Sequence, residues 1–122
     1  MAREVLRTSS QKVRDLEKLT KAVVSVGDCA SSCNACADAC LGEVDVQQLS
    51  RCIGLLMDCA TICQATAAVL SRPGSKEMEA FTAQLNACIA MCKATGAECR
   101  KHAQRHEHCK ACAESCDHCT QL

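Results

Sequence analysis

The chain has 122 residues, enough for one hydrophobic core but too few for two, so we expect a single domain over residues 1–122. Lysines plus arginines and aspartates plus glutamates both number 14, and without a basic excess we expect no binding to nucleic acid or to a membrane surface. The unusual count is 14 cysteines, beside one Phe and no Trp or Tyr. Residues 1–10 alternate charged and isolated apolar side chains, unlike a signal peptide, so the expected compartment is the cytoplasm.

The first two predicted elements are helices, because apolar residues and cysteines recur in steps of three and four. The first helix is expected over residues 10–41, continuous through Gly27 and ending at a C-cap around Gly42. The second is expected over residues 45–71. At its start, Asp45 followed three residues later by Gln48 predicts a capping box.

Two further helices follow, over residues 75–102, with Ser75 as N-cap, and over residues 106–121. Short connections make neighbouring helices antiparallel, so the expected fold is all-α, an up-down four-helix bundle. The fourth helix is short and leaves one end of the bundle partly open. The first dozen residues, including Val5 and Leu6, could cover that end as a short extra helical segment, or a second subunit could do so.

The cysteines follow the helical period, with every gap inside a predicted helix equal to three, four or seven. Each set therefore lies on one helix face, which it shares with leucines, so this face is expected to line the core. The sets are Cys29, Cys33, Cys36 and Cys40; Cys52, Cys59 and Cys63; Cys88, Cys92 and Cys99; and Cys109, Cys112, Cys116 and Cys119.

An antiparallel bundle would bring all four sets to the same end. The opposite end would be an apolar base that holds the helices together without metal. It is expected to contain Leu16, Leu19, Val23, Leu70, Phe81 and Leu85.

Cysteines in such numbers indicate a soft metal, because thiolates favour Cu(I), zinc or iron–sulfur clusters. Pairs one turn apart, such as Cys29 with Cys33, place two sulfurs side by side and suit chains of bridged Cu(I) sites. We therefore predict that all 14 cysteines are ligands for multiple Cu(I) ions, at a capacity of about one ion per cysteine. This stoichiometry favours storage or sequestration over catalysis.

Two histidines extend the predicted metal site. His102 continues the cysteine face of the third helix and His108 precedes Cys109, so both are predicted as ligands where ions enter. His106 lies at the same end as either a ligand or a loop residue, whereas His118 lies opposite the cysteines and is expected to face solvent.

Other readings of the cysteines remain open. Zinc could use Cys109 with Cys112 and Cys116 with Cys119, although such pairs usually sit in turns rather than on regular helix. A ferredoxin-like iron–sulfur protein usually has a proline after its cysteines, and Pro73 is remote from them. A redox enzyme would need one distinctive thiol, for which Cys109 is the candidate. Cysteines can also serve only as small apolar core residues.

The chain also resembles a known family, the bacterial copper storage proteins, over residues 25–120. The resemblance rests on the stretch from Cys88 through Cys99, on Lys101-His102, on His106 through Cys112, on Cys116-x-x-Cys119 and on Asp58 through Cys63. It implies a homotetramer of four-helix bundles that hold Cu(I) mainly by cysteine pairs, with histidine contributing near the open end. Exported members carry a twin-arginine signal, so this chain resembles the cytosolic branch.

Overall fold

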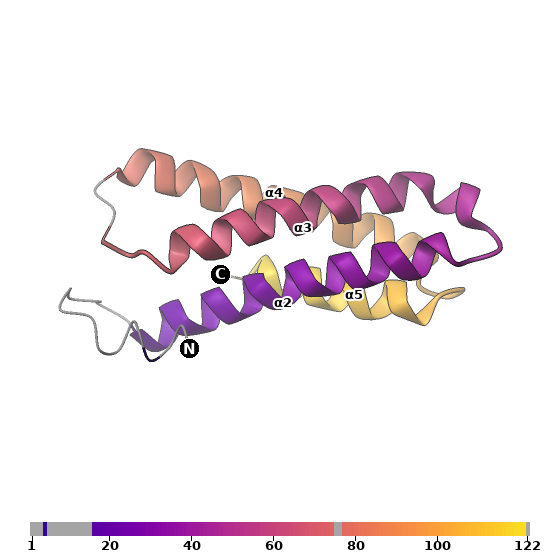
Figure 1. Ribbon diagram of the computed structural model, residues 1–122, viewed down its shortest axis with the longest axis horizontal. Helices are drawn as coiled ribbons and strands as arrows, with labels where there is room; N and C mark the ends of the chain where they lie inside the picture. The colour runs from indigo at the N-terminus through magenta and orange to yellow at the C-terminus, as the bar shows by residue number, and fades with distance from the viewer. Residues whose placement is uncertain (1–3, 5–15, 75–76, 122) are drawn as a thin grey trace.

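The protein is an antiparallel four-helix bundle, seen here in a computed structural model that describes residues 4, 16–74 and 77–121 (Figure 1). Its elements are α2 (Leu16–Leu41), the 3-10 helix η1 (Val46–Leu49), α3 (Ser50–Leu70), α4 (Met78–His102) and α5 (Glu107–Cys119). Within the described residues, α2 and α4 each lie beside α3 and α5, and the two helices of a diagonal pair bring no Cα atoms within 8 Å of each other. This arrangement confirms the predicted fold.

The helix limits agree with the sequence predictions at several points. Helix α2 runs through Gly27 without a break and ends at Leu41, as expected. Helix α5 begins one residue and ends two residues inside the predicted range 106–121. The predicted start of the first helix, the Ser75 cap and the extra N-terminal segment with Val5 and Leu6 lie outside the described residues.

At the α2–α3 turn the predicted end of α2 next to Gly42 is correct, whereas the predicted capping box at Asp45 is wrong. No described glycine has a positive φ, so Gly42 is not a left-handed cap; its amide donates to the Ala39 carbonyl at 3.1 Å and tightens the last turn of α2. Asp45 makes no side-chain cap hydrogen bond, and the chain passes through η1 before α3 begins. The Asp45 carboxylate lies instead 3.1 Å from Nε2 of His106 in the α4–α5 turn.

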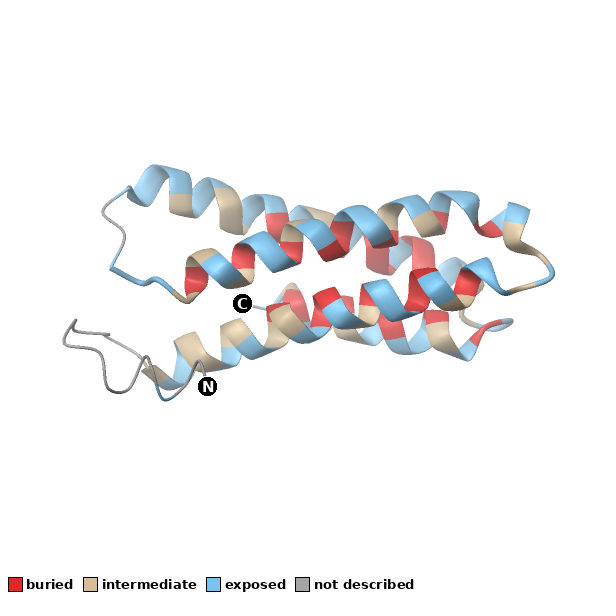
Figure 2. Cartoon of the chain, in the orientation of Figure 1, coloured by how far each residue is buried: buried red, intermediate tan, exposed pale blue. Residues whose placement is uncertain are grey.

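Helix α5 determines which half of the bundle is closed. At 1.5 Å per residue its 13 residues span about 20 Å, against about 37 Å for the 25 residues of α4. The C-terminal end of α5 therefore lies near the middle of the bundle (Figure 1). Buried residues gather in the half that α5 covers, whereas the other half is mostly intermediate or exposed (Figure 2). In that apolar base Leu70 is buried, and Leu19, Val23, Phe81 and Leu85 are partly buried.

Two contacts hold α5 closely against α4. A Cβ placed on Gly96 would lie 3.3 Å from Cβ of Cys116, so glycine allows the two backbones to approach. Nearby, the Arg100 guanidinium donates to both carboxylate oxygens of Asp117, at 2.7 and 2.9 Å. Both contacts lie beside the cysteine faces of these helices.

One described stretch, Val46–Leu70, is long and apolar enough to cross a membrane by length and composition alone. Its cysteine face, with Cys52, Cys59 and Cys63, is buried against the other helices. A buried helix of a bundle meets the same length criterion, so this is weak evidence for a membrane protein.

Candidate metal centre

All 14 cysteines are free thiols buried in the bundle, each at most 3% exposed. The predicted burial of every cysteine face is thereby confirmed. Sulfur groups that draw on all four helices confirm that the four sets meet in one half of the molecule. We call this cysteine-lined interior, formed by the 14 cysteines named above, the thiol tube.

The inner part of the thiol tube contains two groups whose sulfurs all lie within 4.8 Å of one another. One group is Cys29, Cys33, Cys59 and Cys116; the other is Cys29, Cys63, Cys92 and Cys119. Cys29 belongs to both, and its sulfur is 3.8 Å from those of Cys92 and Cys116. The closest pair on different helices is Cys63 with Cys92, at 3.6 Å.

The outer part continues the same chain of sulfurs. Cys33 is 3.8 Å from Cys112, which forms a further group with Cys36 and Cys99. The last group is Cys36, Cys40, His108 and Cys109. Cys52 and Cys88 fall in none of these groups, but each approaches a neighbour, Cys99 and Cys63 respectively, at 3.8 Å. Every thiol is therefore within reach of another along the whole tube.

Burial and mutual contact control the protonation of these thiols. Burial raises the pKa of Cys109 to about 12, with the nearby Cys40 thiol adding to the effect. Where thiols share protons the pKa values diverge: a hydrogen bond from Cys116 lowers the pKa of Cys112, and the hydrogen bond with Cys112 raises the pKa of Cys33. Metal binding must displace the protons that remain, because thiolates are the ligands.

The α2–α3 and α4–α5 turns meet at the outer end of the tube. We call this place the tube mouth, and it consists of Glu43, Asp45, His106 and His108. The Nδ1 atom of His108 lies 3.4 Å from the Cys36 sulfur and 3.6 Å from that of Cys109. The geometry thus brings His108 to the thiols, as the sequence predicted.

The other histidines have different surroundings. Both ring nitrogens of His106 face carboxylates, Nε2 at 3.1 Å from Asp45 and Nδ1 at 3.6 Å from Glu43. Nε2 of His102 is 3.1 Å from the buried carboxylate of Glu98, and His102 joins none of the thiol groups among the described residues. His118 is exposed, as expected.

Residues 15–122 match the sequence profile of the family described as copper storage protein. The chain belongs to the copper storage protein family. The predicted resemblance is therefore confirmed, and a chain of close thiols is the kind of interior that can hold many soft ions.

Solved structures and a curated relative agree with this membership. The structure of the copper storage protein Ccsp from Streptomyces lividans, loaded with 10 copper equivalents, is 44% identical, with a TM-score of 0.95 over 99% of this chain and 93% of that one. A cytosolic copper storage protein from Streptomyces lividans with five coppers is 48% identical, with a TM-score of 0.84 over 86% and 88% of the two chains. The uncharacterized cysteine-rich protein YhjQ of Bacillus subtilis is 40% identical over 77% of this chain and 82% of that protein.

Sequence reasoning missed the acidic residues around the histidines of this copper storage protein. Glu43 approaches Nε2 of His108 at 3.3 Å, and Glu98 accepts from Lys101 and pairs with Arg51, both at 3.3 Å. Burial opposes ionisation of Glu98, but hydrogen bonds from His102 and Lys101 lower its pKa. The antiparallel topology already places the two turns at one end, and this signal could have identified Glu43.

Proposed function

We propose that this chain stores Cu(I) in the thiol tube, with all 14 cysteines as ligands and His108 as a ligand at the tube mouth. The continuous chain of buried sulfurs carries the proposal, because every thiol has a neighbour within 4.8 Å. Cu(I) accepts two or three thiolates and tolerates bridging sulfurs, so such a chain can be filled throughout. His102 also remains a predicted ligand, although in this structure its Nε2 contacts Glu98.

Storage is favoured over a redox or hydrolytic enzyme. A reactive cysteine needs solvent access and a lowered pKa. The thiols of Cys36, Cys40 and Cys109, which lie within 3.9 Å of Nδ1 of His108, are all buried, and burial raises the pKa of Cys109 to about 12. The remaining thiols form a continuous set in which none is set apart by an adjacent base and an open approach.

Copper is also favoured over zinc. Structural zinc prefers separate tetrahedral sets of four ligands, whereas the two inner groups share Cys29. Two complete zinc sites cannot use the same terminal thiolate independently. A shared sulfur suits bridged Cu(I) instead.

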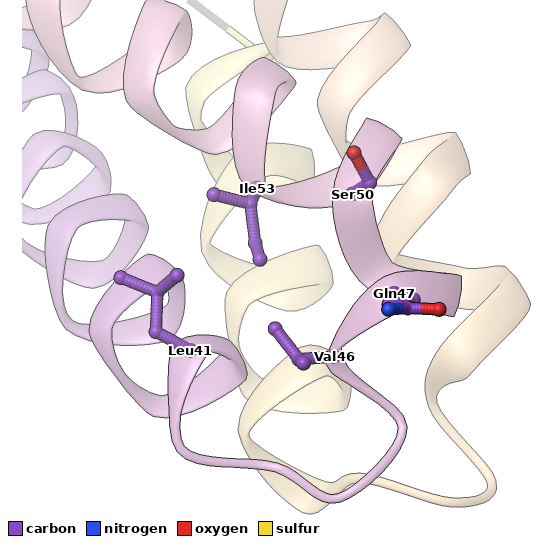
Figure 3. Close-up of a pocket in the computed structure, with 5 residues that line it drawn as sticks. All are labelled: Leu41, Val46, Gln47, Ser50 and Ile53. Atoms are coloured by element: carbon purple, nitrogen blue, oxygen red, sulfur yellow. The ribbon is translucent and has the colours of Figure 1, made fainter.

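We further propose that the protein acts in the cytoplasm as a homotetramer, as the family resemblance implies. The similar structure of a cytosolic copper storage protein from Streptomyces lividans supports a location in the cytoplasm. An apolar hollow beside the α2–α3 turn supports self-association. The exposed Leu41 and the partly buried Val46 and Ile53 point toward one another around it, and Gln47 and Ser50 also line it (Figure 3). Light scattering of the purified chain tests the tetramer, and a monomer at micromolar concentration would contradict it.

The storage function is tested by anaerobic titration of the reduced protein with Cu(I) against a competing chelator, combined with elemental analysis. We expect saturation at about one ion per cysteine. Saturation at roughly one ion per four cysteines, the ratio of a zinc-type site, would contradict storage. A parallel titration with zinc serves as the control.

A further inference from the structure

The orientation of the His108 ring is fixed on both sides. Its Nδ1 atom faces the thiol tube, at 3.4 Å from the Cys36 sulfur and 3.9 Å from that of Cys40. Its Nε2 atom faces outward, 3.3 Å from Oε1 of Glu43. The imidazole therefore stands between a group of soft ligands and a single carboxylate.

These two contacts assign the ring proton. An ionised carboxylate can only accept a hydrogen bond, so the nitrogen facing Glu43 must carry a proton. A neutral imidazole has one proton, which leaves the Nδ1 lone pair directed at Cys36, Cys40 and Cys109. The opposite tautomer would set the Nε2 lone pair against the carboxylate of Glu43.

Glu43 is itself held in place. Its second oxygen, Oε2, lies 3.6 Å from Nδ1 of His106, whose Nε2 is 3.1 Å from Asp45. The His106 ring stacks on the His108 ring, with centroids 5.2 Å apart and planes inclined by 30°. The α2–α3 turn thus supplies the carboxylates and the α4–α5 turn supplies the rings.

We propose that Glu43 is a positioning residue that holds His108 with its proton on Nε2, so that Nδ1 is the atom presented to a Cu(I) ion shared with the neighbouring thiols. The role of Glu43 in Cu(I) binding rests on the proposed storage function, whereas the orientation of the His108 ring does not depend on it. Carboxylate partners of metal-bound histidines typically change metal affinity about 10–100-fold. Glu43 is thereby given a role distinct from that of a ligand.

Nitrogen NMR of the reduced, copper-free protein labelled with ¹⁵N-histidine tests the assignment. We expect a protonated Nε2 whose proton exchanges slowly with water, and an unprotonated Nδ1. Glu43→Gln should keep this signal, because its amide oxygen still accepts the hydrogen bond. Glu43→Ala should lose the slowly exchanging proton and let the ring sample both tautomers.

Asp45→Ala is the matched control, because it removes a neighbouring carboxylate of the same turn that contacts His106 rather than His108. If the Asp45 variant lost the His108 proton signal as completely as the Glu43→Ala variant, the turn as a whole and not Glu43 would hold the ring. A proton on Nδ1 in the unmodified chain would also overturn the proposal.

The second measurement follows the Nδ1 shift of His108 during Cu(I) titration against a chelator. We expect the affinity of the ion seen by His108 to fall about 10–100-fold in Glu43→Ala and to remain within about threefold in Glu43→Gln and Asp45→Ala. An unchanged affinity in Glu43→Ala would overturn the positioning role. The total number of Cu(I) ions bound depends on the thiols and therefore tests the storage function separately. A low number in the unmodified chain would count against storage. The NMR result on the copper-free protein would still decide the role of Glu43.

Discussion

The two halves of the bundle are built on the same helical period but closed in different ways. Of the described helices, α2, α3 and α4 alone enclose the apolar base, and Phe81 and Leu85 there remain partly exposed. The thiol half gains α5, and its cysteines are at most 3% exposed. The more completely sealed half is thus the one that contains oxidisable groups. Hydrocarbon side chains tolerate some contact with water, whereas thiolates exposed to oxidants are readily oxidised.

The same comparison separates folding from storage. Leucine and phenylalanine in the base stabilise the fold by burial whether or not metal is present. Thiols in the tube contribute burial too, but their S–H hydrogen bonds are weak, and their protons are replaced when metal binds. We therefore expect mutations in the base to act on the stability of the copper-free protein, and mutations in the tube to act on copper.

The largest effect on folding is expected for Leu70→Ala. Leu70 is 4% exposed in the base, and truncation of a buried leucine costs about 2–4 kcal/mol through lost burial and the cavity left behind. Urea unfolding of the copper-free protein measures this loss. Val24→Ala, at a position 55% exposed, is the matched control and should change the unfolding free energy by less than about 0.5 kcal/mol. If the folded Leu70 variant bound fewer copper ions, the base would also affect copper binding, which would contradict the separation of the two functions.

The largest effect on copper is expected for Cys29→Ser. Cys29 belongs to both inner groups of sulfurs, and a serine hydroxyl is a poor ligand for Cu(I), so capacity should fall by about two ions. Cys88→Ser is the comparison, because Cys88 is equally buried but lies in neither group; we expect a loss of about one ion. Anaerobic titration measures both, and equal losses would show that the shared position of Cys29 has no special weight.

A smaller effect is expected where α5 closes on α4. Alanine in place of glycine usually stabilises a helix by about 1 kcal/mol. At Gly54 a new Cβ would meet nothing within 4 Å, and Gly54→Ala should show this gain. At Gly96 the new Cβ would lie 3.3 Å from that of Cys116, so Gly96→Ala should show a net loss of about 1 kcal/mol. Thermal unfolding of the copper-free variants distinguishes them, and a gain at both sites would contradict the tight α4–α5 contact.

A further effect, confined to high pH, is expected from a single thiol. Burial raises the pKa of Cys109 to about 12, above the ordinary value of 9.0 that we take for the unfolded chain. Between these values the unfolded chain loses the Cys109 proton and the folded chain keeps it. The contribution of Cys109 is therefore fully present below about pH 9 and is lost as pH rises towards 12. Comparison of Cys109→Ala with the unmodified chain by urea unfolding at pH 8 and pH 10.5 measures it, and a shallower decline is expected in the variant.

Periodicity in the sequence correctly predicted the helices and their buried cysteine faces. It could not predict the contacts between the two turns at the tube mouth, which are far apart in the sequence. Cys29 to Cys40 repeat at helical steps, so their common face and its burial followed directly. Asp45 was misassigned because its local pattern fits a helix cap, while its actual partner, His106, is 61 residues away. Glu43 was overlooked for the same reason: its role depends on which His108 nitrogen faces outward, and ring orientation is determined by tertiary contacts.

The connectivity of the helices has a mechanical consequence. Helices α2 and α3 form one hairpin, α4 and α5 form another, and the chain joins the two hairpins only at the base, between Leu70 and Met78. At the mouth they are held together by side chains alone, such as Arg105 with Gln48 at 3.2 Å and His106 with Asp45. The two hairpins are therefore joined covalently at the base and by reversible side-chain contacts at the mouth, so they can separate most easily at the mouth. Each Cu(I) ion that bridges sulfurs of the two hairpins, as between Cys29 and Cys92, would cross-link them. The hairpins of the copper-loaded protein should therefore separate less readily than those of the copper-free protein.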